Sequence, residues 1–121
     1  MLRSLDIKNV AVIENLNIEF KSGLTVLTGE TGAGKSIIID SINMILGSRT
    51  NKTLVRYGAS KAFVSAFFDA DKRFDALFED LGIQQEDGII ISRSMSADGK
   101  SIARINGVMV PLNVLRDIAA S

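Results

Sequence analysis

The residues best suited to chemistry in this chain form one short run, GETGAGKS, from Gly29 to Ser36. The run fits the phosphate-loop pattern G-x-x-x-x-G-K-[ST] at every fixed position. Its glycines let the backbone curl so that successive N–H groups surround a phosphate, and a following helix adds the positive end of its dipole. In such loops a lysine, here Lys35, reaches the β- and γ-phosphates, while the Ser36 hydroxyl ligates Mg²⁺. The pattern therefore predicts a nucleoside triphosphate site.

A strand and a helix must hold this loop in place, and the sequence supplies both. The apolar run from Leu24 to Thr28 predicts a short buried strand before the loop. Lys35 to Leu46 predicts a helix that is apolar on most sides, as expected of a helix packed against a sheet inside a domain. Gly47 is a plausible end for that helix.

Alternating apolar and polar residues predict further strands on both sides of the loop. We expect strands at Leu2 to Lys8, Val12 to Phe20, Ala62 to Phe68, Gly88 to Met95 and Lys100 to Asn106. Asp98-Gly99 predicts a hairpin turn, and Asn106-Gly107 predicts a second turn. Short helices are expected from Arg73 to Leu81, ended by Gly82, and from Pro111 through Ile118. Lys21 to Gly23 is expected to be a turn, and Ser48 to Ser60 a loop.

The composition fits one globular domain of 121 residues, with 46% hydrophobic and 23% charged side chains. The chain has no cysteine and no histidine, which excludes a disulfide framework, thiolate metal sites and an imidazole base. No apolar run approaches the roughly 20 residues needed to span a bilayer, and no signal peptide opens the chain. We therefore expect a cytoplasmic protein.

The net charge is zero, with 14 basic and 14 acidic side chains, but the charges are unevenly distributed. Ser41 to Phe68 holds Arg49, Lys52, Arg56 and Lys61 and no acid, whereas Asp69 to Asp87 is strongly acidic. The simpler interpretation is a solvated acidic helix beside an ordinary loop. The alternative places the basic loop near the phosphates or near DNA.

Hydrolysis needs more than a phosphate loop, because an acid must hold Mg²⁺ and a further group must orient water. Asp69 follows an apolar segment, but its surroundings favour a turn at the end of a strand. Asp40 is expected to be a packing or capping acid, and Glu30 is expected to point outward. The sequence therefore predicts half of an ATPase site.

Four segments carry a resemblance to a known family: LRSLDIKNVAVIENLNIEF, SGLTVLTGETGAGKSIIIDSINMILG, LVRYGASKAFVSAFF and SRSMSADGKSIARINGVMVPLNVLRDIA. Together they resemble the start of the SMC-like ATPases of the ABC class, in particular members that act in bacterial DNA repair. The phosphate loop specifies only the superfamily, whereas the GKSIARING hairpin and the N-terminal strands are more particular. The resemblance covers essentially the whole chain.

In that family the ATPase head is split into two lobes separated by a long antiparallel coiled coil. The resemblance implies that residues 1–121 are the N-terminal lobe, an α/β P-loop lobe of ABC/SMC type. Its mixed sheet would have an antiparallel N-terminal portion and flanking helices. The signature motif, the Mg²⁺ acid and the catalytic glutamate would belong to the C-terminal lobe, so ATP turnover by this chain alone is not expected.

The resemblance also implies cofactors and partners. ATP and Mg²⁺ would bind between this chain and a second head in an ATP-sandwiched homodimer, and head closure would be coupled to DNA holding and double-strand break repair. The partners would be the C-terminal lobe of the same protein, the second head and DNA, in the cytoplasm at the nucleoid, with no membrane.

By position, the resemblance implies that the phosphates and Mg²⁺ are held by Gly29, Thr31, Gly32, Ala33, Gly34, Lys35, Ser36 and Ile37. Lys35 would also stabilise the transition-state charge, and the N–H of Ile37 would reach the α-phosphate. Arg56 falls near a loop arginine that faces DNA or the nucleotide in SMC heads. Lys8 and Asn9 could approach the base or the ribose.

Other nucleotide-binding classes fit less well. ABC transporter subunits usually carry an aromatic residue upstream of the loop that stacks on adenine, and the only aromatic residue before Lys21 is Phe20, which fits a core position better. P-loop kinases and GTPases tend to place the loop directly after the first strand, whereas two expected strands precede Leu24 here.

Overall fold

The structure is a computed structural model that describes residues 2–11, 13–19, 32–47, 54–85 and 88–119, with only the backbone at 32–36 and 119. Its strands form a six-stranded sheet in the order β2-β1-β3-β4-β5-β6. They are β1 (Leu2–Val10), β2 (Ile13–Glu19), β3 (Lys61–Phe68), β4 (Ile89–Ser96), β5 (Ser101–Ile105) and β6 (Val108–Val110). The helices are α1 (Gly32–Ile45), the 3₁₀ helix η2 (Lys72–Phe74), α2 (Asp75–Leu81) and α3 (Leu112–Ala119).

Every neighbouring pair among these strands is antiparallel. The expected α/β class and flanking helices are confirmed, and the antiparallel portion extends over all of the described sheet. The parallel contribution that a mixed sheet requires is not found among these strands. The expected strand from Leu24 to Thr28 and the turn from Lys21 to Gly23 lie outside the described residues.

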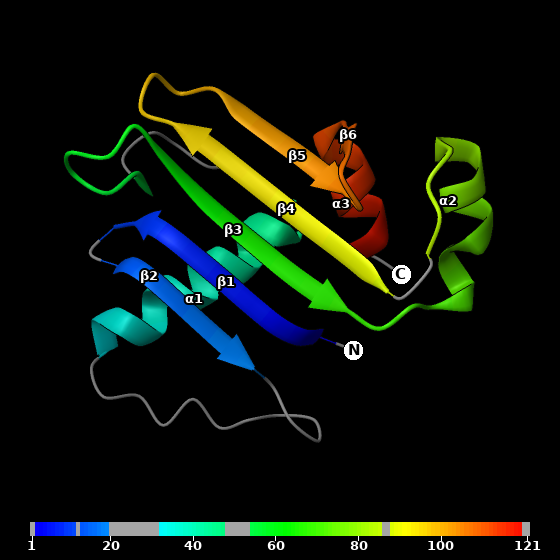
Figure 1. The fold of residues 1–121 in the computed structure, drawn as a ribbon, viewed down its shortest axis with the longest axis horizontal. Helices are drawn as coiled ribbons and strands as arrows, with labels where there is room; N and C mark the ends of the chain where they lie inside the picture. Colours follow the sequence, from blue (N-terminus) through cyan, green and yellow to red (C-terminus); the bar gives the residue numbers. More distant parts are fainter. Residues whose placement is uncertain (1, 12, 20–31, 48–53, 86–87, 120–121) are drawn as a thin grey trace.

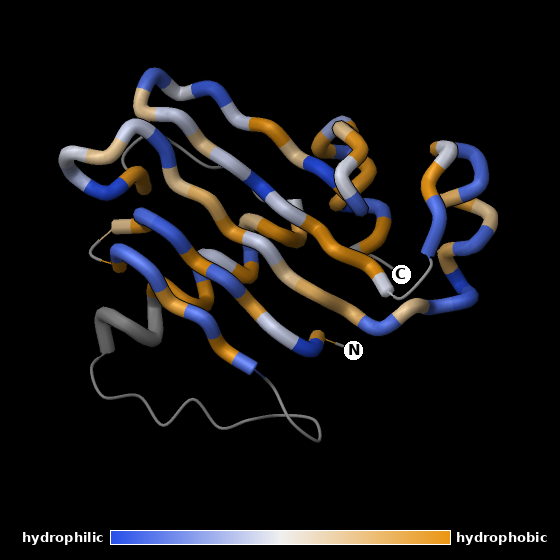
Figure 2. The backbone as a smooth tube through the Cα atoms, in the orientation of Figure 1, coloured by the Kyte–Doolittle hydropathy of each residue, from blue (hydrophilic) through white to orange (hydrophobic). Residues whose placement is uncertain are grey.

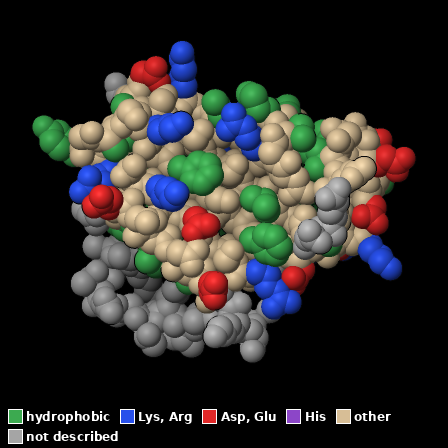
Figure 3. All heavy atoms as spheres, viewed as in Figure 1, with side chains coloured by type: hydrophobic (Ala, Val, Ile, Leu, Met, Phe, Trp, Pro, Cys, Tyr) green, Lys and Arg blue, Asp and Glu red, His purple; other side chains and the backbone are tan. Residues whose placement is uncertain are grey.

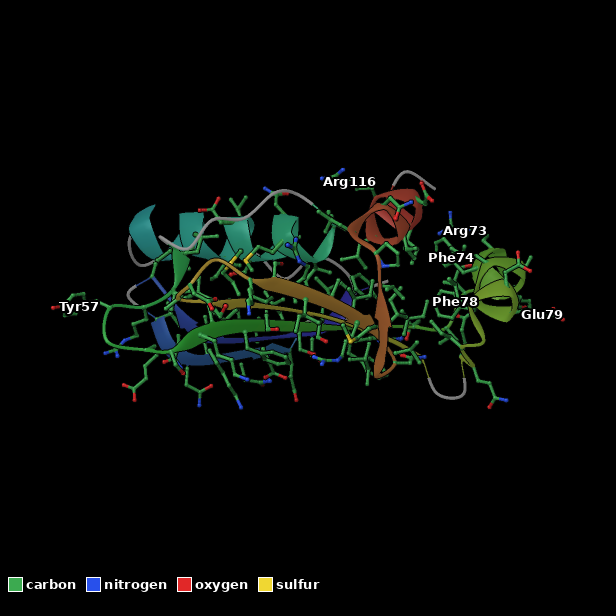
Figure 4. The ribbon with its side chains drawn as sticks, turned by 90° about the horizontal axis from the view of Figure 1, so that it is seen from above. Tyr57, Arg73, Phe74, Phe78, Glu79 and Arg116 are labelled. Atoms are coloured by element: carbon green, nitrogen blue, oxygen red, sulfur yellow. The ribbon has the colours of Figure 1, made fainter. Side chains whose placement is uncertain are left out.

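The sheet has one covered face and one open face. In Figures 1 and 4, α1 and α3 lie on the same side of the sheet, while α2 lies beyond one end of it. Strand alternation sends Leu5 and Ile7 of β1 to the covered face, where both are fully buried. Figure 2 shows the corresponding alternation of hydropathy along β1 and β2. The side chains on the open face are a mixture of apolar, basic and acidic types (Figure 3).

The covered face forms the core together with the two helices. Alternate residues of β3, β4 and β5 on this face are buried, and they pack against Met44 and Ile45 of α1 and Leu115 of α3. This burial explains why α1 is apolar over most of its length. One half of its surface packs on the sheet, whereas Ile39 on the other half is 47% exposed.

The region after β3 forms a short helical unit at the end of the sheet. Asp71 caps η2 by accepting a hydrogen bond from the backbone N–H of Arg73, and α2 ends at Gly82 in the left-handed conformation, φ 71°. Phe74 and Phe78 are buried with their rings 6.4 Å apart. The predicted helix from Arg73 to Leu81 is thus confirmed, with its first turn in the 3₁₀ form.

The two predicted turns also occur where the sequence placed them. Gly99 lies in the β4–β5 hairpin and Gly107 in the β5–β6 turn, both with positive φ that a glycine adopts without strain. None of the described helices is both long enough and apolar enough to cross a membrane.

Candidate nucleotide-binding site

The amino end of α1 lies within the phosphate-loop sequence. The helix begins at Gly32, so the backbone from Gly32 to Ser36 is helical. The N–H groups of the first turn of a helix have no carbonyl partner within the helix, and the helix dipole makes this end positive. These donors suit an anionic phosphate. Gly29 and Thr31 lie outside the described residues, as do the side chains of Lys35 and Ser36.

The donor set at this end of the helix fits a Mg²⁺–nucleotide. Free N–H groups and the Lys35 ammonium are donors for phosphate oxygens, and the Ser36 hydroxyl is an oxygen ligand of the kind that Mg²⁺ binds. Ile37 follows immediately, and its half-buried side chain packs against the core. The phosphate and metal roles of Gly32 to Ile37 stay predictions.

Packing against β3 and β4 holds α1 on the sheet. Ser41, Met44 and Ile45 are at most 1% exposed, and they lie on the side of the helix that faces the strands. Gly47 ends this segment with a left-handed φ of 96°, and its N–H donates to the Met44 carbonyl oxygen at 3.2 Å. The predicted stop at Gly47 is confirmed.

Two arginines far along the sequence, one on β4 and one on α3, bind the carboxyl end of α1. Arg93 of β4 donates from Nη1 to the Met44 carbonyl oxygen at 2.9 Å and from Nη2 to the Ser101 hydroxyl at 2.7 Å. Arg116 of α3 donates from Nε to the Gly47 carbonyl oxygen at 2.9 Å (Figure 4 labels Arg116). Neither arginine stood out in the sequence. The available signal, for Arg93 alone, was a basic residue in phase with the apolar residues Ile89, Ile91 and Met95 of its strand.

Arg93 is only 2% exposed. Burial, and secondarily the neighbouring positive charge of Arg116, lower the pKa of its guanidinium from the ordinary value. The small side chains of Val64 and Ala103 flank Arg93 on the two neighbouring strands and leave it room. A charged group thus sits in the core, with its hydrogens directed at the last turn of α1.

Asn9 and Arg56, which the sequence marked separately, lie together. The Arg56 N–H donates to the Asn9 carbonyl oxygen at 2.8 Å, and the Ala11 N–H donates to the Leu54 carbonyl oxygen at 2.7 Å. Asn9 has a φ of 55°, and this left-handed residue shifts the strand alternation so that Val10 is buried as well as Ile7. The loop carrying Arg56 is therefore tied to the end of β1.

Lys8 lies on the other face. It is in register with Asn15 and Phe63, on the side of the sheet opposite to Ile7 and α1, and its side chain is exposed. This placement argues against its predicted approach to a nucleotide at the amino end of α1. The expected roles of Asn9 near the base or ribose and of Arg56 near DNA or the nucleotide stay predictions.

The acids considered for Mg²⁺ take other places. Asp69 directly follows β3, and its carboxylate accepts a hydrogen bond from Arg3 Nε at 2.8 Å. That bond is the main cause lowering the pKa of Asp69. The arrangement supports the turn interpretation. Asp40 is exposed on α1, so the expectation that it packs is not met. The described residues contain no group of three or more acidic side chains placed to hold a metal ion.

The acidic segment from Asp69 onward is a solvated helix, as its simpler interpretation predicted. Asp75, Glu79 and Asp80 of α2 are exposed, while Phe78 turns into the core (Figure 4 labels Phe78 and Glu79). The corresponding basic residues Arg49 and Lys52 lie outside the described residues.

Comparison with known proteins agrees with this architecture. Residues 4–107 match a family described as the AAA domain. The chain is 50% identical to the DNA repair protein RecN of Halalkalibacterium halodurans, over 100% of this chain and 22% of that protein. It is 46% identical to the DNA repair protein RecN of Bacillus subtilis, over 98% of this chain and 21% of that protein.

The fold is also found in solved structures. An SMC ATPase from work on ATP-driven dimerization and DNA-stimulated activation superposes with a TM-score of 0.79 at 25% identity, over 98% of this chain and 77% of that one. The chain spans about a fifth of the length of the curated relatives it matches. Because the family match covers most of its residues, the chain belongs to the AAA domain family, and it is related in sequence to the DNA repair protein RecN.

Proposed function

We propose that this chain is the ATP-binding N-terminal lobe of an SMC-like ATPase head that acts in DNA double-strand break repair and recombination. The observation that carries the proposal is the start of α1 at Gly32, which places the first-turn N–H groups of a sheet-packed helix within GETGAGKS. Whole-chain similarity to RecN proteins supplies the repair context. Bound Mg²⁺–ATP would supply the phosphate charge and the metal ion. The Lys35 ammonium would neutralise part of that charge, and the Ser36 hydroxyl would ligate Mg²⁺.

The surface of α1 supports the presence of a second lobe. Ile39 is 47% exposed on the side of α1 that faces away from the sheet, and Leu46, directly after the helix, is 38% exposed. A helix with apolar residues on both sides is normally buried between two layers. We propose that a C-terminal lobe of the same protein covers this side and brings the signature motif, the Mg²⁺ acid and the catalytic glutamate.

Head pairing follows from the same division of the site. The superposed SMC ATPase is described with ATP-driven dimerization and DNA-stimulated activation. By analogy, a second copy of the head would close on ATP bound at α1, and DNA would act on the full-length protein in the cytoplasm, at the nucleoid. The isolated chain would bind ATP with negligible turnover, since its half of the site holds the phosphates without the catalytic acids.

Replacement of Lys35 by alanine tests the proposal. Lys35→Ala in the full-length protein removes the cation expected on the β- and γ-phosphates, so we expect ATP turnover to fall roughly 100-fold or more. Survival after DNA double-strand breaks should fall to the level of a deletion strain. Lys61→Ala, on an exposed strand position, is the control and should leave both unchanged. Normal repair and normal turnover in Lys35→Ala would refute the assignment.

A further inference from the structure

The carboxyl end of α1 is fixed more firmly than packing alone requires. Met44 and Ile45 already bury this end against the sheet. Arg93 adds a hydrogen bond from β4 to the Met44 carbonyl oxygen, and Arg116 adds one from α3 to the Gly47 carbonyl oxygen. Arg93 thus binds a carbonyl oxygen of the last helical turn that also accepts the Gly47 N–H, and Arg116 binds a carbonyl oxygen two residues beyond the helix.

These hydrogen bonds control a motion that apolar contacts do not. Close packing of interdigitated side chains resists large shifts of a helix on a sheet, but apolar burial is non-directional and sets no preferred distance or angle between particular atoms. Hydrogen bonds require specific distances and angles. The bond from Arg93, whose other end is held by the Ser101 hydroxyl on β5, therefore fixes α1 along its axis relative to the sheet.

Burial of Arg93 is expensive, which argues that its charge has a use. Desolvation and the nearby charge of Arg116 both disfavour the protonated guanidinium, as the direction of its pKa shift shows. An apolar side chain of similar volume fills a buried position without that penalty. The gain that offsets the penalty is a cation at the negative end of α1, which carries no basic residue in its own last turn.

We propose that Arg93 is a positioning residue for nucleotide binding, and that Arg116 extends the same contact to α3. The inference rests on the proposed binding of ATP at the amino end of α1. The helix has 14 residues, so it is a rod about 21 Å long at ~1.5 Å per residue. A shift at its carboxyl end therefore appears at its amino end, and a displacement of about 1 Å can reduce the efficiency of a site roughly 100-fold.

The hydrogen bond from Arg116 connects the carboxyl end of α1 to α3 as well as to the sheet. Gly47 lies against α3 so closely that a Cβ added to it would be 2.7 Å from Arg116 Cγ and 3.0 Å from the Arg116 backbone nitrogen. Any axial shift of α1 on binding phosphate would therefore be transmitted to α3. The contact therefore couples the carboxyl end of α1 to α3.

The test compares three variants of the full-length protein. Arg93→Met approximately keeps the volume and removes the hydrogen bonds of the guanidinium, whereas Arg93→Lys keeps the charge but replaces the planar guanidinium with a single ammonium. Arg104→Met is the matched control, because Arg104 lies on β5 in register with Ser92, on the open face. For each protein, the dissociation constant of Mg²⁺–ATP is measured by calorimetry, and Tm is measured with and without Mg²⁺–ATP.

We expect Arg93→Met to bind Mg²⁺–ATP roughly tenfold more weakly or worse and to lose most of the rise in Tm that ATP causes. Arg93→Lys should be intermediate, and Arg104→Met should match the wild type. A purely structural role would lower Tm without ATP and leave the ATP affinity of the folded protein unchanged. That outcome, in either Arg93 variant, overturns the proposal. If Arg93→Met does not fold, Arg93→Lys alone decides.

Hydrogen exchange without nucleotide separates this inference from the proposed function. Loss of the Arg93 hydrogen bonds should speed exchange at the N–H groups of Leu46 and Gly47. These groups donate to the carbonyl oxygens of Ile42 and Met44 respectively. Unchanged exchange there in both Arg93 variants would show that Arg93 does not hold the helix, and would overturn the inference. Failure of the wild type to bind ATP would instead refute the proposed function, and with it the nucleotide role of Arg93.

Discussion

The amino end of α1 offers N–H donors to a ligand, whereas its carboxyl end offers carbonyl acceptors to the protein itself. The donors at Gly32 and beyond come from one continuous stretch of chain. The acceptors at Met44 and Gly47 are bound by Arg93 and Arg116, which lie 49 and 69 residues further along the chain than those acceptors. The carboxyl end of α1 is therefore held by side chains from the sheet and from α3, whereas the amino end is left for a ligand.

The largest expected effect at the carboxyl end comes from removing its packing. Ile45→Ala should destabilise the protein by about 2–5 kcal/mol, because it leaves a cavity beneath the last turn of α1. Ile90→Ala, at a position 44% exposed on the other face, should cost less than about 1 kcal/mol. Chemical denaturation of both variants measures the difference. Equal losses would mean that the covered face is no more important than the open one.

Gly47→Ala should produce the next largest effect. The residue adopts a φ of 96°, and its added Cβ would press against the Arg116 backbone nitrogen as well as the side chain. Together these should cost about 1–3 kcal/mol. Gly99→Ala, with a φ of 95° and open space around it, is the control for the backbone conformation alone. Similar Tm losses in the two variants would contradict a close contact between α1 and α3.

At the amino end, Ser36→Ala should weaken binding without weakening the fold. Loss of the proposed Mg²⁺ ligand should raise the dissociation constant of Mg²⁺–ATP roughly tenfold while leaving the Tm of the unliganded protein unchanged. Chelation of Mg²⁺ in the wild type should reproduce the weaker binding. A variant with unaltered affinity in the presence of Mg²⁺ would remove Ser36 from the metal site.

The smallest effect concerns the exposed ion pair between Arg3 and Asp69. The pKa of Asp69 is lowered by its hydrogen bond with Arg3, so the pair stabilises the fold above the unfolded pKa of the acid, and that contribution is lost as the pH falls through the folded pKa. Both side chains are about half exposed, so the contribution is small. Arg3→Ala should slightly reduce the loss of unfolding free energy at acid pH, which denaturation at several pH values measures. NMR titration of Asp69 should show its pKa rising in the same variant. An unchanged Asp69 pKa in this variant would exclude the pair.

Most of the strands and helices could be predicted from the sequence because their signals are local. The alternation in β1 to β5, the hairpin at Gly99, the helix stops at Gly47 and Gly82, and the helix after Pro111 are all found. The shift of alternation at Asn9 could not be predicted, since it depends on a left-handed residue tied to the loop at Arg56. The face on which Lys8 lies could be predicted, because the same alternation that buries Leu5 and Ile7 turns Lys8 to the other side of β1.

The phosphate-loop pattern, the strand and helix segments and the family resemblance were all determined by the sequence itself, because each depends on the order of neighbouring residues. Tertiary structure alone decided how α1 is held. Arg93 shares the phase of the apolar residues Ile89 and Ile91 in β4, which indicates burial, but only the pairing of β4 with β3 and β5 and the position of α1 bring it to the Met44 carbonyl oxygen. The physical reason is that a hydrogen bond between distant segments depends on register and packing direction, which short-range patterns do not encode.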